Sequence, residues 1–293
     1  MSVNNFFKEK GMKRKMKILI TGSNGMLANA IKEELKNEEL ICTDVAELDI
    51  TNSEQVNKFI KEVKPEYIIN CAAYTAVDKA EENREIAYKI NAIGPKNLAV
   101  AAKENNAILM HVSTDYVFGG DKPIEQDYNE EDEKNPQAVY GTTKLEGEKF
   151  IEENCSKYYI FRTAWLYGEG HNFVRTMLDL GKTKEEVKVV NDQHGSPTYS
   201  VDLANIIHQV IDKKIEFGVY NSTNIGYTTW YDFTKKIFEL KNVNCKVIPV
   251  TSEEFKSPAK RPKNSQMSKN KLLKNGINIP TYEDALKRYL LKQ

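Results

Sequence analysis

The stretch from Lys17 to Asp44 constrains the fold more than any other part of this 293-residue chain. An apolar run at 17–21 is followed by a glycine-containing turn at 22–25, and then apolar residues recur at every fourth position: Leu27, Ile31 and Leu35. This spacing predicts a buried parallel strand and a helix that packs one apolar stripe on a sheet. A second apolar run, 40–43, ends at Asp44. Strand, glycine turn, helix and acidic strand end, in that order, predict a dinucleotide-binding unit.

The small residues of the turn have a physical role in such a unit. Gly22 is suited to the positive φ of a sharp strand-to-helix turn. Gly25 has no Cβ to keep a pyrophosphate away from the free N–H groups at the helix start, where the helix dipole favours an anion. Ala28 lets the helix approach the strand closely. The spacing is G-x-x-G-x-x-A, which predicts a nucleotide site only in this context of strand and helix.

Composition excludes several classes of protein. Basic and acidic residues number 42 each, so the chain lacks the positive charge typical of nucleic-acid binding. No apolar run approaches the ~20 residues that a membrane span needs. The four cysteines form no C-x-x-C pair and the four histidines show no ligand spacing. We therefore expect reduced thiols in a cytoplasmic protein, with no metal site and neither a membrane nor a nucleic-acid partner.

The order of elements predicts an α/β fold. Strands alternate with helices through residue 112, which is typical of a Rossmann-type, doubly wound parallel sheet. A helix is expected over 78–104, with a break at Gly94-Pro95, and 125–133 is expected to be a solvated loop. Residues 1–15 are predicted to be a disordered extension and 16–168 an NAD(P)-binding Rossmann domain. Residues 169–293 are predicted to form mainly a smaller C-terminal α/β substrate lobe, while some later strands and helices return to the first domain.

Ligands of such sheets bind outside the carboxyl ends of the strands. Gly25, Asp44, Ala73 and Thr114 are all expected at such ends. Tyr140 and Lys144 are four residues apart, so on a helix they share one face. A tyrosine beside an ammonium group is a plausible proton donor, because the cation lowers the phenol pKa from about 10. The alternative is that this pair only decorates a wet helix face; a hydroxyl at Thr114 on the preceding strand end favours the catalytic interpretation.

These motifs together resemble an extended short-chain dehydrogenase/reductase. Longer matches are similar to the signature of the dTDP-4-dehydrorhamnose reductases, and they lie at 70–81, 113–118, 140–144, 162–167, 192–198 and 261–265. The resemblance covers about residues 16 to 292. Departures are small: Cys71 stands where alanine is common, and Ala28 stands where glycine is common.

The resemblance implies the last step of dTDP-L-rhamnose synthesis, in which a hydride from NADPH or NADH goes to C4 of dTDP-4-dehydro-L-rhamnose. Tyr140 would protonate the new alkoxide, Thr114 would polarise the keto oxygen, and Lys144 would tune Tyr140 and hold the ribose. Implied cofactor-binding residues are Gly22, Gly25, Met26, Leu27, Asp44, Asp49, Ile50, Ala72, Ala73, Tyr74, Thr75, Tyr140 and Lys144. Implied substrate-binding residues are Val77, Thr114, Asp115, Tyr140, Trp165 and Arg261.

Several alternatives stay open at this point. Trp165 could belong to the core, Arg261 could be a solvated loop residue, and His194 has no partner that the sequence names. The fold also serves reductases and epimerases of other nucleotide sugars, and non-catalytic regulatory subunits. Monomer and homodimer are equally open.

The choice between the two cofactors depends on local charge. Asp44 would accept hydrogen bonds from both adenosine ribose hydroxyls, and Glu47 and Asp49 add negative charge beside it. A 2′-phosphate would be repelled there. The sequence therefore predicts that NADH serves at least as well as NADPH, although members of the family are usually described as using NADPH.

Overall fold

The computed structural model describes residues 14–293. The predicted disordered extension therefore lies outside the described residues, except for Arg14 and Lys15. The Arg14 guanidinium pairs with the Glu66 carboxylate at 3.2 Å. Glu66 immediately precedes a central strand, so this part of the basic cluster lies at the amino-terminal edge of the sheet.

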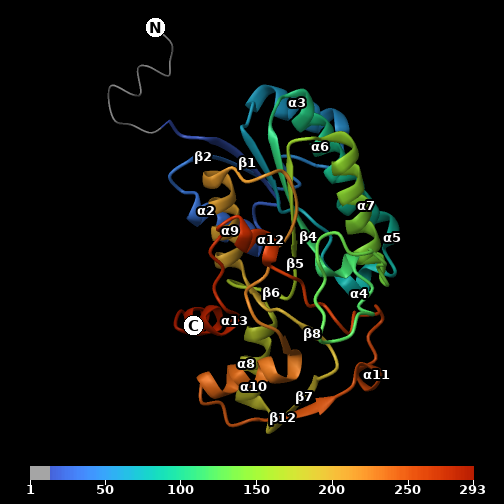
Figure 1. Ribbon diagram of the computed structural model, residues 1–293, viewed down its shortest axis with the longest axis vertical. Helices are drawn as coiled ribbons and strands as arrows, with labels where there is room; N and C mark the ends of the chain where they lie inside the picture. Colours follow the sequence, from blue (N-terminus) through green and yellow to red (C-terminus); the bar gives the residue numbers. More distant parts are fainter. Residues whose placement is uncertain (1–13) are drawn as a thin grey trace.

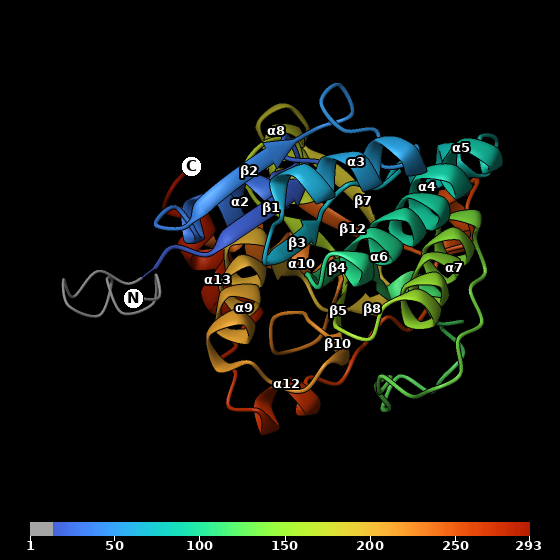
Figure 2. The same cartoon turned by 90° about the horizontal axis from the view of Figure 1, so that it is seen from above.

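Six parallel strands form the central sheet (Figure 1), in the spatial order β10-β5-β4-β3-β1-β2, which can be followed by the labels in Figure 2. Their bounds are β1 Lys17–Thr21, β2 Glu39–Thr43, β3 Tyr67–Asn70, β4 Ile108–Thr114, β5 Tyr158–Thr163 and β10 Gly218–Asn221. The chain adds β2 on one side of β1 and β3 on the other, so the strand order reverses beside β1. This confirms the doubly wound parallel sheet and puts the expected ligand crevice at the ends of β1 and β3.

Helices cover both faces of the sheet, as the two views show (Figures 1 and 2). One face is covered by α2 Met26–Glu34 and α9 Ser200–Lys213, and the other by α3 Ser53–Val63, α6 Gly94–Glu104 and α7 Val139–Asn154. Each face has its own apolar core: Ile18, Ile20 and Ile31 belong to the first, and Leu19 and Ile68 to the second. Successive residues of β1 thus point to opposite faces, and both faces are buried, as expected for a parallel sheet.

The second half of the chain forms a smaller group of elements below the sheet in Figure 1. It contains α8 Phe173–Thr183, β7 Glu186–Val190, α10 Trp230–Leu240, β12 Lys246–Val250, α11 Ser252–Phe255 and α13 Tyr282–Leu290. Strands β7 and β12 pair in parallel. Short pairs complete it, between β6 Leu166–Tyr167 and β9 Thr198–Tyr199 and between β8 His194–Gly195 and β11 Thr228–Thr229. Strand β10 and helix α9 return to the central sheet, and α12 Asn270–Lys274 contacts β10.

The predicted break at Gly94-Pro95 is wrong. Helix α5, Arg84–Tyr88, continues through a π-helical turn at Lys89–Ile93 directly into α6, whose first turn contains Pro95. Pro95 has no N–H to bond a carbonyl of the preceding turn, and the π-helical turn directly before it is where the usual hydrogen-bond ladder is interrupted without ending the helix. The interruption falls earlier, between α4 Val77–Ala80 and α5. A π-turn inside a helix often marks a functional position, and this one contains Asn91.

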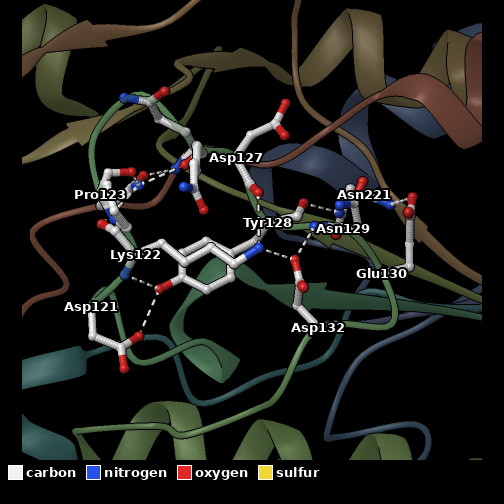
Figure 3. Close-up of polar contacts among 12 residues, drawn as sticks. Asp121, Lys122, Pro123, Asp127, Tyr128, Asn129, Glu130, Asp132 and Asn221 are labelled. Carbon is white, nitrogen blue, oxygen red and sulfur yellow. Dashed lines mark hydrogen bonds and ion pairs between the residues drawn. The ribbon is translucent and has the colours of Figure 1, made fainter.

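The predicted solvated loop at 125–133 is irregular but firmly held (Figure 3). Tyr128 and Glu130 are buried. The Tyr128 hydroxyl donates to the Asp121 carboxylate at 2.9 Å and accepts from the Lys122 N–H at 3.0 Å. Asn221 at the end of β10 donates to the Tyr128 carbonyl and, through its own N–H, to Glu130. The interpretation as a solvated loop therefore fails for its middle, because long-range polar partners bury it.

Within residues 14–293, no helix combines the length and the apolar character needed to cross a membrane.

Candidate active site

A cavity of about 660 Å³ opens at the carboxyl ends of the central strands. It collects the residues predicted from the sequence with two exceptions: Gly22, Gly25, Met26, Leu27, Asp44, Asp49, Ile50, Ala72, Ala73, Thr75, Val77, Thr114, Asp115, Tyr140, Lys144 and Trp165 all line it. The exceptions are Tyr74, whose backbone bonds the Asn91 side chain, and Arg261, which lines neighbouring cavities.

The glycine turn fits a dinucleotide. Gly22 has a φ of +64°, and a Cβ there would lie 2.6 Å from the Ala72 nitrogen, so only glycine suits this position. Gly25 precedes the first turn of α2, and among the described residues no side chain caps that helix start. Uncapped N–H groups at a helix N-terminus attract an anion such as a pyrophosphate. The turn could therefore hold the phosphates of NAD or NADP.

Asp44 follows β2 at the edge of this cavity. Its carboxylate accepts the Asn24 N–H at 3.2 Å and the Val45 N–H at 2.8 Å. Glu47 contacts the Asp44 N–H through its own carboxylate. Within the described chain no lysine or arginine forms an ion pair with Asp44. The site is locally acidic, as the sequence predicts.

Thr114 and Tyr140 come together from β4 and α7. Thr114 ends its strand and is buried, and its hydroxyl donates to the Asp115 carboxylate at 2.9 Å. The Tyr140 ring packs edge-to-face on Tyr116, with ring centroids 5.5 Å apart. Thr114 and Tyr140 both line the main cavity, where a carbonyl oxygen could contact the hydroxyl groups of these two residues.

The pKa of Tyr140 moves opposite to the prediction. Burial of the hydroxyl raises this pKa well above 10, the negative charge of Asp115 raises it further, and only a hydrogen bond with Thr114 opposes the rise. Lys144 does not lower the Tyr140 pKa, because the side-chain nitrogen of Lys144 contacts His111 and the Val112 carbonyl of β4. The phenol consequently keeps its proton throughout the neutral range, which is the form that a proton donor needs.

Lys144 is buried and its amine contacts two groups of β4. It donates to the Val112 carbonyl at 2.6 Å and lies 3.1 Å from His111 Nε2. Burial lowers the pKa of Lys144 to about 8. His111 in turn contacts the Asn70 side chain at 2.9 Å. Sequence reasoning missed the roles of His111 and Asn70; the available signals were a histidine within the apolar first part of β4 and an asparagine at the end of the apolar β3.

A buried ion pair between Glu148 of α7 and Arg162 of β5 stabilises the end of β4. Both nitrogens Nε and Nη2 of Arg162 contact the Glu148 carboxylate, the shortest distance being 2.6 Å, and both side chains are 2% exposed. The Ser113 hydroxyl also donates to Glu148. Because Ser113 precedes Thr114, this pair fixes the backbone from which the Thr114 hydroxyl projects.

Trp165 lies at the border between two cavities. It lines the main cavity and a second one of about 280 Å³ that also contains Phe173 and Trp230. Its φ is +49°, rare for a bulky residue, and its ring stacks on Trp230 with centroids 3.7 Å apart. A Cβ at Gly195 would come within 2.7 Å of this indole. A strained backbone held by close packing often marks a ligand-binding position.

Arg261 lines the second cavity and is not a solvated loop residue. Its guanidinium pairs with the Asp78 carboxylate at 2.9 Å and donates to the Tyr116 hydroxyl at 3.1 Å. Tyr116 lines both cavities. An arginine held in this way can recognise a phosphate with its remaining N–H groups. In the part of the chain that the structure describes, no three His, Cys, Asp or Glu side chains gather as metal ligands would.

Comparison with known proteins agrees with this geometry. A family model described as RmlD substrate binding domain matches residues 16–293, and a dTDP-4-dehydrorhamnose reductase of Aggregatibacter actinomycetemcomitans is 40% identical over 92% of this chain and 97% of its own length. The chain belongs to the dTDP-4-dehydrorhamnose reductase family. The resemblance predicted from the motifs is confirmed.

Solved structures of this family are closely similar. One dTDP-4-dehydrorhamnose reductase from Clostridium acetobutylicum is 53% identical, with a TM-score of 0.92 over 95% of this chain and all of that chain. Another, from Bacillus anthracis, was solved in complex with NADP; it is 45% identical, with a TM-score of 0.91 over 95% and 100% of the two chains. A UDP-glucose 4-epimerase from Thermus thermophilus in complex with NAD is 17% identical with a TM-score of 0.78, which shows the shared fold alone.

Proposed function

We propose that this chain reduces dTDP-4-dehydro-L-rhamnose to dTDP-L-rhamnose, with hydride transfer from NADPH or NADH to C4 and Tyr140 as the proton donor. Membership of the reductase family supports the class of reaction. The observation that carries the residue roles is the convergence of Gly22, Asp44, Thr114, Tyr140 and Lys144 on one cavity. They come from the ends of β1, β2 and β4 and from the first two turns of α7, and together they offer groups for dinucleotide binding and for proton transfer.

Each residue has a defined task in this proposal. Bound NADPH or NADH supplies the hydride. When substrate binds, the Thr114 hydroxyl exchanges the Asp115 carboxylate for the keto oxygen as its acceptor, and so favours the charge that develops there. Tyr140 gives its proton to the resulting alkoxide and recovers one from solvent, so that ketone, hydride and proton balance the alcohol. Lys144 holds the nicotinamide-side ribose hydroxyls.

Different parts of the main cavity bind different parts of the cofactor in this proposal. Gly22, Gly25, Met26 and Leu27 bind the pyrophosphate at the start of α2, and Asp44 binds the adenosine ribose. Asp49 and Ile50 border the adenine. The turn after β3 contributes Ala72, Ala73 and Thr75 to the walls, and Tyr74 of the same turn bonds the Asn91 side chain through its backbone.

Recognition of the substrate is assigned to the boundary between the cavities. Val77, Asp115 and Trp165 border the sugar, and the nucleoside diphosphate extends into the second cavity. Three aromatic residues, Phe173, Trp165 and Trp230, offer flat apolar surfaces for a base there, and Arg261 offers a cation for its phosphates.

Consumption of the reduced cofactor tests the proposal directly. Oxidation with dTDP-4-dehydro-L-rhamnose, and much slower oxidation with the UDP-linked analogue, is the expected result. Equal rates with both would make the chain a reductase or epimerase of other nucleotide sugars. If neither substrate oxidised the cofactor while the cofactor still bound, a regulatory subunit would be the better account. Titration calorimetry with dTDP and UDP on the cofactor-loaded protein gives an independent measure of the same preference.

A further inference from the structure

A chain of buried polar side chains runs beneath the main cavity, from β1 to α7. Thr21, Asn70 and His111 belong to the adjacent strands β1, β3 and β4, and Lys144 belongs to the helix that covers them. Each of the four is at most 1% exposed. Buried polar groups at such depth need complementary donors and acceptors. The donor and the acceptor of each hydrogen bond in this series can therefore be deduced, starting from one group that can only donate.

The fixed end is a backbone amide. The Ala72 N–H, which can only donate, points at Asn70 Oδ1 at 3.1 Å, and the Thr21 hydroxyl donates to the same oxygen at 2.7 Å. The amide group of Asn70 is thus oriented with its nitrogen toward His111. That nitrogen, Nδ2, lies 2.9 Å from His111 Nδ1. Because Nδ2 carries only hydrogens, His111 Nδ1 must be the acceptor.

The assignment propagates through the imidazole ring. A histidine that accepts at Nδ1 carries its single proton on Nε2, and this Nε2–H faces the Lys144 nitrogen at 3.1 Å. An ammonium group has no lone pair, so it would place N–H against N–H at this distance. A neutral amine accepts from His111, donates one hydrogen to the Val112 carbonyl and keeps one hydrogen for the cavity. Only the neutral amine satisfies every contact.

We propose that His111 is a positioning residue which, fixed as the Nε2–H tautomer by Asn70, holds Lys144 as a neutral amine that accepts a hydrogen bond. When Lys144 takes up a proton, its contact with His111 must open, and the ammonium group is left with the Val112 carbonyl and the cavity. The lysine thus has two positions that differ by one proton. In terms of the proposed function, on which this last step rests, only the second offers its full charge to the cofactor and substrate.

The charges around Lys144 are compatible with this assignment. Glu148, one helical turn along α7, would favour the ammonium form, but its carboxylate is paired with Arg162. Cys71 after β3 is a neutral thiol, because burial raises its pKa to about 12. Burial lowers the pKa of His111 well below its usual range, so it stays neutral. On the cavity side the raised pKa of Tyr140 keeps it a neutral phenol. Asp115, whose pKa burial raises to about 6, still carries most of its negative charge at neutral pH and would favour the ammonium form.

Nuclear magnetic resonance of the full-length protein tests the proposal without any enzyme assay. With only four histidines in the chain, ¹⁵N imidazole signals can be assigned by single substitutions. The expected result for His111, without added nucleotide, is a neutral Nε2–H tautomer from pH 6 to pH 9. The Lys144 side-chain signal should titrate well below the ~10.4 of a free lysine. An Nδ1–H tautomer, an imidazolium at pH 6, or a lysine titrating near its free value would overturn the proposal.

Two variants show whether Asn70 acts through the ring. Asn70→Asp presents an acceptor to His111, which should move the proton to Nδ1, free Nε2 to accept from an ammonium group, and raise the Lys144 midpoint by about one pH unit or more. Thr21→Val is the matched control: it removes one hydrogen bond to Asn70 but leaves the Ala72 N–H in place. The control should keep both the tautomer and the midpoint. An unchanged tautomer in Asn70→Asp would contradict the proposed orientation.

The pH profile of the reaction separates this inference from the proposed function. If turnover is present, the pH at which the turnover rate changes as Lys144 titrates should be higher in Asn70→Asp. It should be unchanged in Thr21→Val. If no turnover is found with any substrate, the proposed function fails while the tautomer measurement still decides the role of His111.

Discussion

Replacing Glu148 by leucine should cost the protein a large part of its stability. The substitution leaves the Arg162 guanidinium buried with the Glu130 carbonyl as its remaining acceptor, 2.9 Å from Nη1. Removing one partner of a buried ion pair typically costs ~3–5 kcal/mol, out of a total stability of about 5–15 kcal/mol. Since both side chains here are 2% exposed, we expect the full effect. Ser113 also loses its acceptor, which should disturb the neighbouring Thr114.

The control variant lies on the same helix. Glu146 forms an ion pair with Lys149 at 2.8 Å, but these side chains are 35% and 52% exposed. Exposed pairs are worth ~0–1 kcal/mol, so Glu146→Leu should change the free energy of unfolding little. The double variant Glu148→Leu/Arg162→Met should recover most of the loss, because no uncompensated charge remains.

Urea unfolding followed by circular dichroism at the helix band measures all four proteins: the unsubstituted chain, both single glutamate variants and the double variant. We expect the urea midpoint to fall strongly only for Glu148→Leu. A loss no larger than that of Glu146→Leu would contradict the expected cost of an unpaired buried charge. A double variant as unstable as Glu148→Leu would mean that packing, and not the stranded charge, sets the cost.

Three further predictions concern the cavity. Tyr140→Phe should lower turnover by ~10²–10⁴-fold while cofactor binding survives, and near-normal turnover would exclude the assigned proton donor. The acidic surroundings of Asp44 should make kcat/KM with NADH at least equal to that with NADPH at low salt, since like-charge contact costs a few kcal/mol; a strong preference for NADPH would disprove this. Burial raises the pKa of Asp115 from 3.8 to about 6, so the folded state binds the extra proton and stability falls as pH rises through this window. Asp115→Asn should therefore be more stable than the unsubstituted protein by on the order of 2 kcal/mol at pH 8, with no such gain at pH 4; equal differences in melting temperature at both values would rule this out.

Local spacing along the chain was enough to determine the dinucleotide-binding unit. The fourfold spacing of Leu27, Ile31 and Leu35 and the positive φ at Gly22 follow from helix geometry and backbone sterics, which depend on near neighbours alone. The close approach of Ala72 to Gly22 is a tertiary contact that the spacing does not reveal. Parallel strands then bring their carboxyl ends to one edge. For this reason the sequence alone assigns Asp44 and Thr114, which are far apart along the chain, to one cavity.

The electrostatics of the site were decided by tertiary structure. The spacing of Tyr140 and Lys144 puts them on one helix face but does not say where the amine points, and its contacts with His111 and Val112 cross from α7 to β4. Arg261 meets Asp78 across 183 residues, so the choice between a substrate contact and a solvated loop residue could not be made from the sequence. A pKa depends on burial and on the distance to other charges, and both quantities exist only once the chain is folded. The sequence therefore determined which residues reach the cavity, and the packing of α7 on β4 determined which of them hold protons.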